Sequence, residues 1–155
     1  MSNLSEAVRA KVSEECLTTK CRKKGCSVHL PNSNRQFIVI DMDHSKSPAP
    51  QDGTRCDFLF IGECNSENWV VPLELKKGNA NASEILPQLK AGAIIAERII
   101  PKNENLAFRP VAAYGGELKR AERDAFRDKR HRVKFRQQRE LVRLIRCGVS
   151  LEKAL

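Results

Sequence analysis

The spacing of apolar residues along the chain predicts an alternation of helices and strands. Residues 3–16 carry apolar side chains at three- and four-residue intervals, the spacing that places them on one face of a helix. Residues 37–43, 56–62 and 69–76 are runs of β-branched and apolar residues, which predict three strands. The polar link between the last two runs is short, so these two strands are expected to form an antiparallel hairpin.

A helix and a fourth strand are expected to follow this hairpin. Asn81, Ala82 and Ser83 supply cap chemistry, and the pattern after them predicts a helix over residues 84–98. Counted from Ser83, Pro87 is the fourth helical residue, where a missing N–H removes no intrahelical hydrogen bond. Residues 108–114 predict the fourth strand, and a charged helix is expected over residues 117–128.

Two segments have a less regular pattern. Residues 16–34 show neither period and are interpreted as a loop. Residues 131–136 alternate as a strand does, whereas residues 139–146 have the spacing of a helical face. A hairpin through Gln137 and Gln138 is the alternative interpretation of this tail.

Length and composition indicate one soluble globular domain spanning residues 1–155. The chain is 41% hydrophobic and 30% charged, and no run approaches the 18 apolar residues of a membrane span. Its first residues carry charges where a signal peptide needs an apolar stretch, so we expect a cytoplasmic protein that makes no membrane contact. In a reducing compartment the six cysteines are expected to be free thiols rather than disulfides. A P-loop and a G-x-S-x-G motif are both absent from the sequence.

The formal net charge of +9 favours a polyanionic partner such as nucleic acid. Residues 117–146 hold 12 basic and 5 acidic side chains, so most of the excess lies in a basic C-terminal segment. With aromatic residues at only 5%, we expect contacts to phosphates rather than stacked bases. The arginines proposed to bind nucleic acid are Arg120, Arg123, Arg127, Arg136, Arg139, Arg143 and Arg146.

Three charged residues of the predicted hairpin are candidates for chemistry. Asp57 opens one strand, and Glu74 and Lys76 lie two residues apart near the end of the next, so both side chains share a face. Two carboxylates beside a lysine suit Mg²⁺, which prefers oxygen ligands and keeps several waters. The carbonyl of Leu75 would supply a further oxygen. The alternative is an exposed Glu–Lys pair without a catalytic role.

This arrangement resembles the PD-(D/E)xK, or restriction-endonuclease-like, superfamily of nucleases. The resemblance covers residues 36–114 and consists of Asp57, then Glu74-Leu75-Lys76, then a helix carrying Gln88. It implies an αβββαβ core with a small mixed sheet flanked by helices. It also implies that Asp57 and Glu74 bind Mg²⁺ or Mn²⁺, with Lys76 assisting the attacking water and Gln88 orienting the site.

The resemblance further implies a Mg²⁺-dependent deoxyribonuclease acting in phage defence, restriction or DNA repair. RNA remains open as a substrate, and so do a homodimer and a partner protein that supplies targeting or ATPase activity. The alternative function is a catalytically inactive nucleic-acid-binding or assembly subunit built on a nuclease-like core. The presence of Asp57, Glu74 and Lys76 together favours the active enzyme.

Several residues near this motif carry further expectations. Pro72 removes a ladder hydrogen bond from a central strand and predicts a bulge or an unpaired segment there. Glu14 or Glu15 matches an accessory acidic position of the family. Asp41 and Asp43 are interpreted as the polar end of a strand rather than as ligands.

A second set of residues, Cys16, Cys21, Cys26 and His29, has the donor types of a structural zinc site. Its spacing departs from the C-x2-C pattern, so we favour free, partly buried thiols and keep zinc as the alternative. Cys56, Cys64 and Cys147 are expected to pack as small apolar residues.

Overall fold

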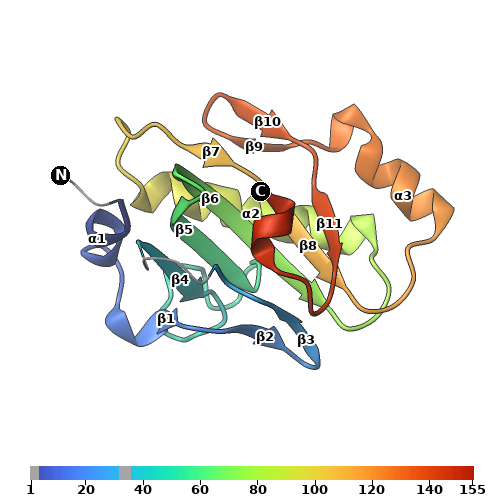
Figure 1. The fold of residues 1–155 in the computed structure, drawn as a ribbon, viewed down its shortest axis with the longest axis horizontal. Helices are drawn as coiled ribbons and strands as arrows, with labels where there is room; N and C mark the ends of the chain where they lie inside the picture. Colours follow the sequence, from blue (N-terminus) through green and yellow to red (C-terminus); the bar gives the residue numbers. More distant parts are fainter. Residues whose placement is uncertain (1–3, 32–35) are drawn as a thin grey trace.

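A seven-stranded mixed sheet forms the centre of the computed structural model, which describes residues 4–31 and 36–155 (Figure 1). Its strands are β1 (Leu17–Thr18), β4 (Phe37–Asp41), β5 (Phe58–Cys64), β6 (Glu67–Lys76), β7 (Ala107–Phe108), β8 (Val111–Tyr114) and β11 (Arg143–Arg146). The order is β1-β4-β5-β6-β8-β11, with β7 also paired to β6. Two separate hairpins are β2 (Cys21–Lys23) with β3 (Cys26–Val28), and β9 (Val133–Phe135) with β10 (Gln138–Glu140).

The helices are α1 (Leu4–Arg9), α2 (Ala82–Ile99) and α3 (Arg120–Arg127), with 3-10 turns η1 (Glu14–Cys16), η2 (Lys129–His131) and η3 (Leu151–Ala154). Strands β4, β5 and β6 run antiparallel, whereas β8 and β11 are parallel to β6. A two-residue turn with positive φ at Asn65 and Ser66 joins β5 to β6, as the short polar link predicts. The crossover through α2 lets β8 return parallel to β6.

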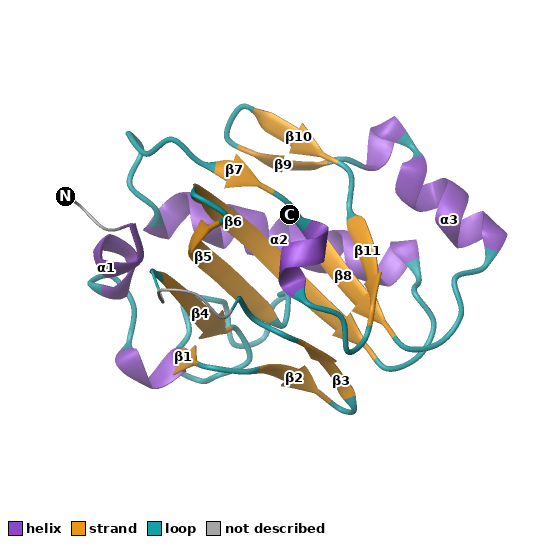
Figure 2. Ribbon diagram, viewed as in Figure 1, coloured by secondary structure: helices purple, strands orange, loops and turns teal. Residues whose placement is uncertain are grey.

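The two faces of the sheet bury separate cores (Figure 2). Helix α2 covers one face, where Ile85, Leu89 and Ala93 pack on the strands together with residues of α1 and the β9–β10 hairpin. The opposite face packs against the β2–β3 hairpin and η3, through residues such as Val28 and Leu151. Strand β5 alternates between the two cores, which is why the run from Phe58 to Ile61 is fully buried.

The ends of most predicted elements are displaced by one or two residues, and three elements differ by more. The opening helix stops at Arg9, and Ser13 caps the separate turn η1; its expected start at residue 3 lies outside the described residues. The strand predicted over residues 108–114 is divided into β7 and β8, and the division lies opposite Pro72 of β6, which has no N–H to donate there. The charged helix is shorter than residues 117–128 and is α3.

Helix α2 begins at Ala82, within the segment that predicted the cap, so counting from Ser83 as the cap is wrong. Asn81 is the N-cap, and Pro87 is therefore the sixth helical residue rather than the fourth. Its missing N–H leaves the carbonyl of Ser83 without its usual i+4 partner. At the start of the helix the Asn81 side chain makes no capping hydrogen bond. Glu122 of α3 takes this role and accepts from the Ala82 N–H at 2.7 Å.

The bulge predicted at Pro72 is absent, and β6 pairs with β5 in unbroken register through it. The N–H of Leu75 points toward β5, whereas the carbonyl of Val70 accepts from Arg109 on the other side of β6. The backbone N and C=O groups of every second strand residue point to the same side. The nitrogen of Pro72 therefore lies on the side of the Val70 carbonyl and faces the break between β7 and β8. Neither β7 nor β8 pairs with β6 at Pro72, which is the unpaired segment that the proline predicts.

The C-terminal segment consists of strands. Residues 133–140 form the β9–β10 hairpin, with Arg136 at positive φ in its turn, as the alternative interpretation predicted. Residues 143–146 form β11 rather than a helix, because they add to β8 as a parallel strand at the end of the sheet order. The predicted loop at residues 16–34 includes β1 and the β2–β3 hairpin, which turns through Lys24 and Gly25, both at positive φ.

Candidate functional site

The structure brings Asp57, Glu74 and Lys76 together where β5 begins and β6 ends. The Asp57 N–H donates to Glu74 Oε1 at 3.0 Å, and the Leu75 N–H donates to Asp57 Oδ2 at 2.8 Å. Each carboxylate therefore uses one oxygen to join the two strands. The antiparallel β5–β6 register, set by the short hairpin link, produces this arrangement.

The two carboxyl groups share a poorly solvated position. Glu74 is 2% exposed, and desolvation together with the charge of Asp57 raises its pKa to about 8, against an opposing effect of Lys76. Burial also raises the pKa of Asp57, although its bond from the Leu75 N–H lowers it. Without a metal, the Glu74 carboxyl therefore tends to keep its proton. A metal cation bound between the two carboxylates would replace that proton.

Lys76 contacts two carboxylates. Its Nζ lies 3.9 Å from Glu74 Oε2 and 3.2 Å from Glu84 Oε2, and Glu84 belongs to the first turn of α2. Sequence reasoning missed Glu84, whose only signal was its place just after a predicted cap. The lysine is thus held beside both a buried and an exposed carboxylate.

A cavity of about 570 Å³ adjoins these side chains. Its lining includes Asp57, Lys76, Glu84 and Gln88, so α2 and the two strands form its walls. The Oε1 atom of Gln88 is buried and has no hydrogen-bond partner in the described chain. The predicted position of Gln88 beside the site is consistent with this lining. Glu14 lies elsewhere and pairs with Arg9 at 3.2 Å, and neither Glu14 nor Glu15 lines the cavity.

The oxygen donors present fit a hard divalent cation. Asp57 Oδ1 and Glu74 Oε2 are not used in the bonds between the strands. Because the N–H and C=O of one strand residue point to the same side, the Leu75 carbonyl also faces Asp57. Among the described residues no cluster of three or more His, Cys, Asp or Glu side chains forms a metal cage. Two carboxylates and a carbonyl suit Mg²⁺ or Mn²⁺, which completes its shell with water and phosphate.

A network of charged side chains forms the wall beside Asp57. Lys23 of the β2–β3 hairpin places Nζ 2.9 Å from Asp43 Oδ2, and Asp43 Oδ1 accepts from Arg55 Nε at 2.7 Å. Burial opposes ionisation of Asp43, but these two bonds outweigh it and lower the pKa of this carboxyl. Asp43 and Arg55 line the same cavity as Asp57. Asp43 is therefore more than the polar strand end that its sequence position indicated.

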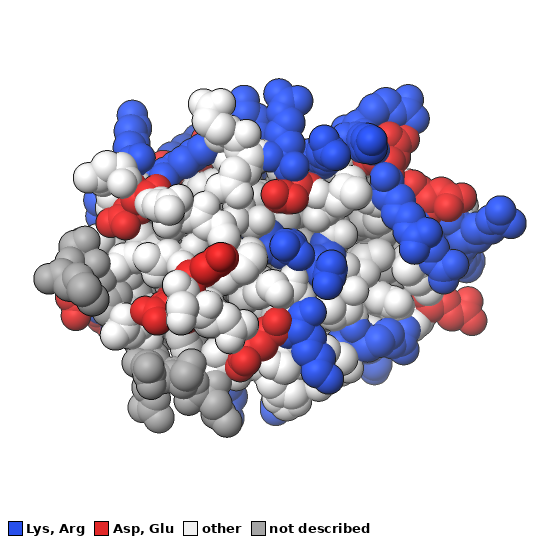
Figure 3. Space-filling model, turned by 45° about the horizontal axis from the view of Figure 1, so that its top comes forward, with Lys and Arg blue, Asp and Glu red and all other residues white. Residues whose placement is uncertain are grey.

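The predicted nucleic-acid-binding arginines divide into two groups. Arg136 Nη2 donates to the carbonyls of Ile100 and Pro101, and Arg146 donates to those of Gly115 and Gly116, so both are engaged in holding loops. Those whose side chains are exposed and make no hydrogen bond or ion pair in the described chain are Arg120, Arg123, Arg127, Arg139 and Arg143. Figure 3 shows Lys and Arg side chains gathered at the end of the molecule that α3 forms, with acidic side chains among them.

The cysteine and histidine set does not form the alternative zinc site. Cys26 and Cys147 are joined in a disulfide that links the β2–β3 hairpin to the chain just after β11, so the expectations for both residues are wrong. Cys16 and Cys21 are buried thiols; burial raises the pKa of Cys21 to about 12, whereas His29 is exposed. The four residues are close in sequence, but Cys26 finds its partner 121 positions away.

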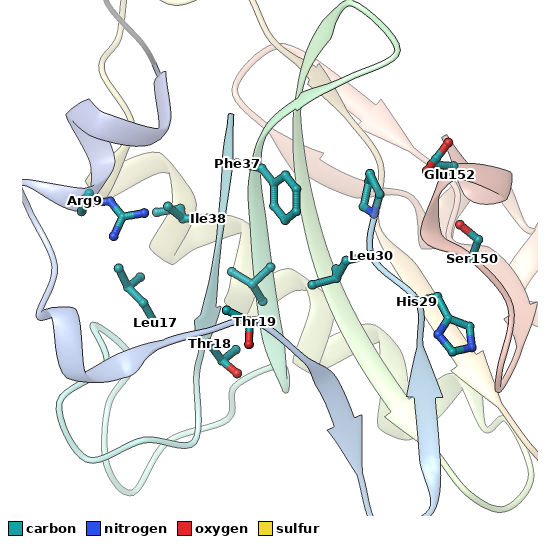
Figure 4. Close-up of a pocket in the computed structure, with 12 residues that line it drawn as sticks. Arg9, Leu17, Thr18, Thr19, His29, Leu30, Phe37, Ile38, Ser150 and Glu152 are labelled. Carbon is teal, nitrogen blue, oxygen red and sulfur yellow. The ribbon is translucent and has the colours of Figure 1, made fainter. Parts of the chain in front are cut away.

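Figure 4 shows a larger cavity, of about 870 Å³, whose lining includes neither Asp57 nor Glu74. Its walls come from α1, β1, β4 and η3, with Arg9, Phe37 and Glu152 among the lining residues. Of the predicted site residues it includes His29 alone. The chemistry-bearing side chains therefore gather around the smaller cavity.

Comparison with known proteins adds no relative to this description. No protein-family model, no curated protein and no solved structure matches the chain. Within residues 4–31 and 36–155, none of the helices has both the length and the apolar character required to cross a bilayer.

Proposed function

We propose that this protein is a metal-dependent nuclease that hydrolyses phosphodiester bonds in DNA with Mg²⁺ or Mn²⁺. The observation that carries the proposal is the placement of Glu74, a buried carboxylate, against Asp57 and Lys76, which line a cavity. A strongly desolvated carboxylate pair raises the free energy of the metal-free protein, and such perturbed groups are typical of functional sites.

Each residue has a chemical role in this proposal. Asp57, Glu74 and the Leu75 carbonyl would hold the cation, which supplies a Lewis acid for the phosphate. Lys76 would orient the attacking water and stabilise negative charge as it develops on the phosphate. Gln88, whose Oε1 lacks a partner in the described chain, would accept a hydrogen bond from that water.

The order of elements supports the restriction-endonuclease-like core. In chain order come a helix (α1), three antiparallel strands (β4, β5 and β6), a second helix (α2) and a strand parallel to β6 (β8), with β1, β2 and β3 inserted after α1 and β7 inserted before β8. This is the αβββαβ order that the resemblance implies, with β1 and β11 as additions at the ends of the sheet order. The acidic motif lies on the second and third of these strands.

The basic surface supports a nucleic-acid substrate. Helix α3 carries exposed Arg120, Arg123 and Arg127, and its Glu122 bonds to the first turn of α2, which lines the cavity. The cationic surface thus begins beside the candidate site. Contacts from these arginines to phosphates would hold a strand near Asp57 without selecting a base sequence.

An inactive nucleic-acid-binding subunit is the second candidate. The observation that favours it is the 3.2 Å ion pair of Lys76 with Glu84, which occupies the lysine in the metal-free protein. In that function binding would persist and cleavage would be absent in every metal. Phage defence, restriction and repair are the processes in which either form would act.

The test is incubation of the purified protein with plasmid, linear duplex and RNA in Mg²⁺, Mn²⁺ or EDTA. We expect metal-dependent cleavage of DNA that Asp57→Asn, Glu74→Gln and Lys76→Ala each abolish, while affinity for DNA is retained. Glu67→Gln, at the exposed start of β6, is the matched control and should cut normally. Cleavage by the Glu74→Gln variant at the wild-type rate would overturn the site assignment. Binding without cleavage in all conditions would favour the inactive subunit.

A further inference from the structure

Arg55 is the most firmly held cation at the candidate site. It lies in the loop between β4 and β5, two residues before Asp57, and lines the cavity with Asp57 and Lys76. Its Nε donates to Asp43 at 2.7 Å, and its Nη1 donates to the carbonyls of Pro50 and Gln51 at 3.0 and 2.8 Å. These bonds fix the plane of the guanidinium group before any substrate arrives.

The bonding pattern leaves part of this group unused. A guanidinium has five N–H donors in a planar fork, and the three bonds account for those on Nε and Nη1. Nη2 makes no hydrogen bond within residues 4–31 and 36–155. An arginine whose remaining donors are already oriented loses little side-chain entropy when it binds an anion.

Asp43 and Lys23 support this orientation from behind. Asp43 accepts from Arg55 through one oxygen and lies 2.9 Å from Lys23 Nζ through the other, while Lys23 also lies 3.4 Å from Asp41. The four side chains sum to zero formal charge. With no net charge, the group does not attract anions in general. What it offers an anion at the site is the oriented N–H donors of Arg55 Nη2.

Lys23 is itself fixed by the fold. It ends β2, and the Cys26–Cys147 disulfide ties the same hairpin to the chain after β11. Its Nζ also lies 5.3 Å from the ring centroid of Phe58, the residue that follows Asp57. The position of Lys23, and through it that of Asp43, is thus set by parts of the chain far apart in sequence.

We propose that Arg55 binds a phosphate oxygen of the nucleic-acid strand that enters the cavity, and that Asp43 and Lys23 act as its positioning residues. This inference rests on the proposed function, because it takes the substrate to be a phosphodiester. The N–H groups of Nη2 can donate charge-assisted hydrogen bonds to an anionic phosphate oxygen. Arg55 would hold the strand beside Asp57 without contacting the bases.

The test compares equilibrium binding with cleavage. The affinity for a fluorescent DNA duplex is measured by anisotropy in EDTA, where a metal-dependent enzyme does not cut, and KM and kcat are measured in Mg²⁺. We expect Arg55→Gln to raise Kd and KM about tenfold, since one hydrogen bond to a charged group is removed. Lys46→Gln is the control, because it removes an exposed charge from the same loop outside the cavity. Wild-type Kd and KM in the Arg55→Gln variant would overturn the proposal.

A second variant covers loss of folding. Arg55→Lys keeps the charge and can keep the contact with Asp43, but it lacks both Nη1 and Nη2. It should melt below the wild type, because the bonds to the Pro50 and Gln51 carbonyls are lost, and at a temperature where it is fully folded it should still bind several-fold more weakly. Full affinity in the folded Arg55→Lys variant would contradict the role of Nη2.

The positioning role has a separate readout. Asp43→Asn should weaken binding in the wild-type background and add nothing in the Arg55→Gln background, because the two residues act as a unit. Additive losses would show that Asp43 has an independent, structural effect, and would overturn its positioning role.

Failure of this inference and failure of the nuclease proposal are distinguishable. A wild-type protein that binds DNA through Arg55 but cuts nothing in any metal would refute the nuclease and support the phosphate contact. Cleavage by Arg55→Gln with wild-type Kd and KM would support the nuclease and refute the phosphate contact. Absence of any DNA binding would refute both proposals.

Discussion

The buried Glu74 carboxyl predicts a pH dependence of stability that a single substitution removes. Its pKa is raised from 4.5 to about 8, chiefly by desolvation. Between these two pH values the folded protein keeps a proton that the unfolded chain has released. Raising the pH across this range therefore lowers the stability of the metal-free protein, because folding must then bury a charge.

The size of the effect follows from the difference in proton affinity. A tenfold difference is worth about 1.4 kcal/mol, so the shift of Glu74 corresponds to roughly 5 kcal/mol between acid and alkaline solution. Since Glu74 is 2% exposed, solvent screening reduces this figure little. Glu74→Gln keeps an oxygen that can accept from the Asp57 N–H but does not ionise, so its stability should lack this contribution. Asp57, whose pKa burial also raises, remains in both proteins.

Urea unfolding in EDTA at several pH values from 5 to 9 measures the difference. The free energy of unfolding of the wild type should fall relative to Glu74→Gln as the pH rises, with most of the change complete near pH 8. Adding Mg²⁺ at pH 8.5 should then stabilise the wild type more than the variant, since the metal binds the folded site. Parallel pH profiles for the two proteins would refute the reasoning, because they would mean that Glu74 ionises as freely in the fold as in the unfolded chain.

Four further predictions test other parts of the structure. Replacing Arg139 and Arg143 by Glu should weaken DNA binding in all sequences alike, because both side chains are exposed and unpaired in the described chain. The slope of log K against log salt should fall by about 0.9 for each phosphate that is no longer neutralised. An unchanged slope would show that this surface does not bind DNA. Cys147→Ser should lower the free energy of unfolding by about 4 kcal/mol under oxidising conditions, because the disulfide closes a long loop, and should have no effect after reduction of both proteins. Gly62→Ala should destabilise the fold by more than about 2 kcal/mol, since Gly62 has φ +146° and an added Cβ would clash with the backbone of Gln36 and Phe37; wild-type melting would contradict this. Metal analysis of dialysed protein should find no stoichiometric zinc, because Cys26 is in a disulfide and Cys16 and Cys21 are separate buried thiols. One equivalent of zinc that is lost in the Cys21→Ser variant would reverse this assignment.

Local pattern was sufficient to predict the central hairpin and its acidic motif. Strands β5 and β6 are buried on both faces, so each appears in the sequence as a continuous apolar run, and the two-residue turn between them leaves one compact register. Strand alternation then places Glu74 and Lys76 on one face beside Asp57, as the structure shows. These features depend on residues within about twenty positions of one another, which is the range over which periodicity and turn chemistry act.

Tertiary structure alone decided the features that join distant segments. The pattern of residues 143–146 fits either a helical face or a strand, and only pairing with β8 determines that they form β11. The disulfide partner of Cys26 lies 121 residues away, beyond any local spacing rule. Lys23, Asp43 and Arg55 likewise meet because the β2–β3 hairpin packs against the sheet beside Asp57. Their charges are ordinary surface charges in the sequence, and the ion pairs between them beside Asp57 are what make them part of the site.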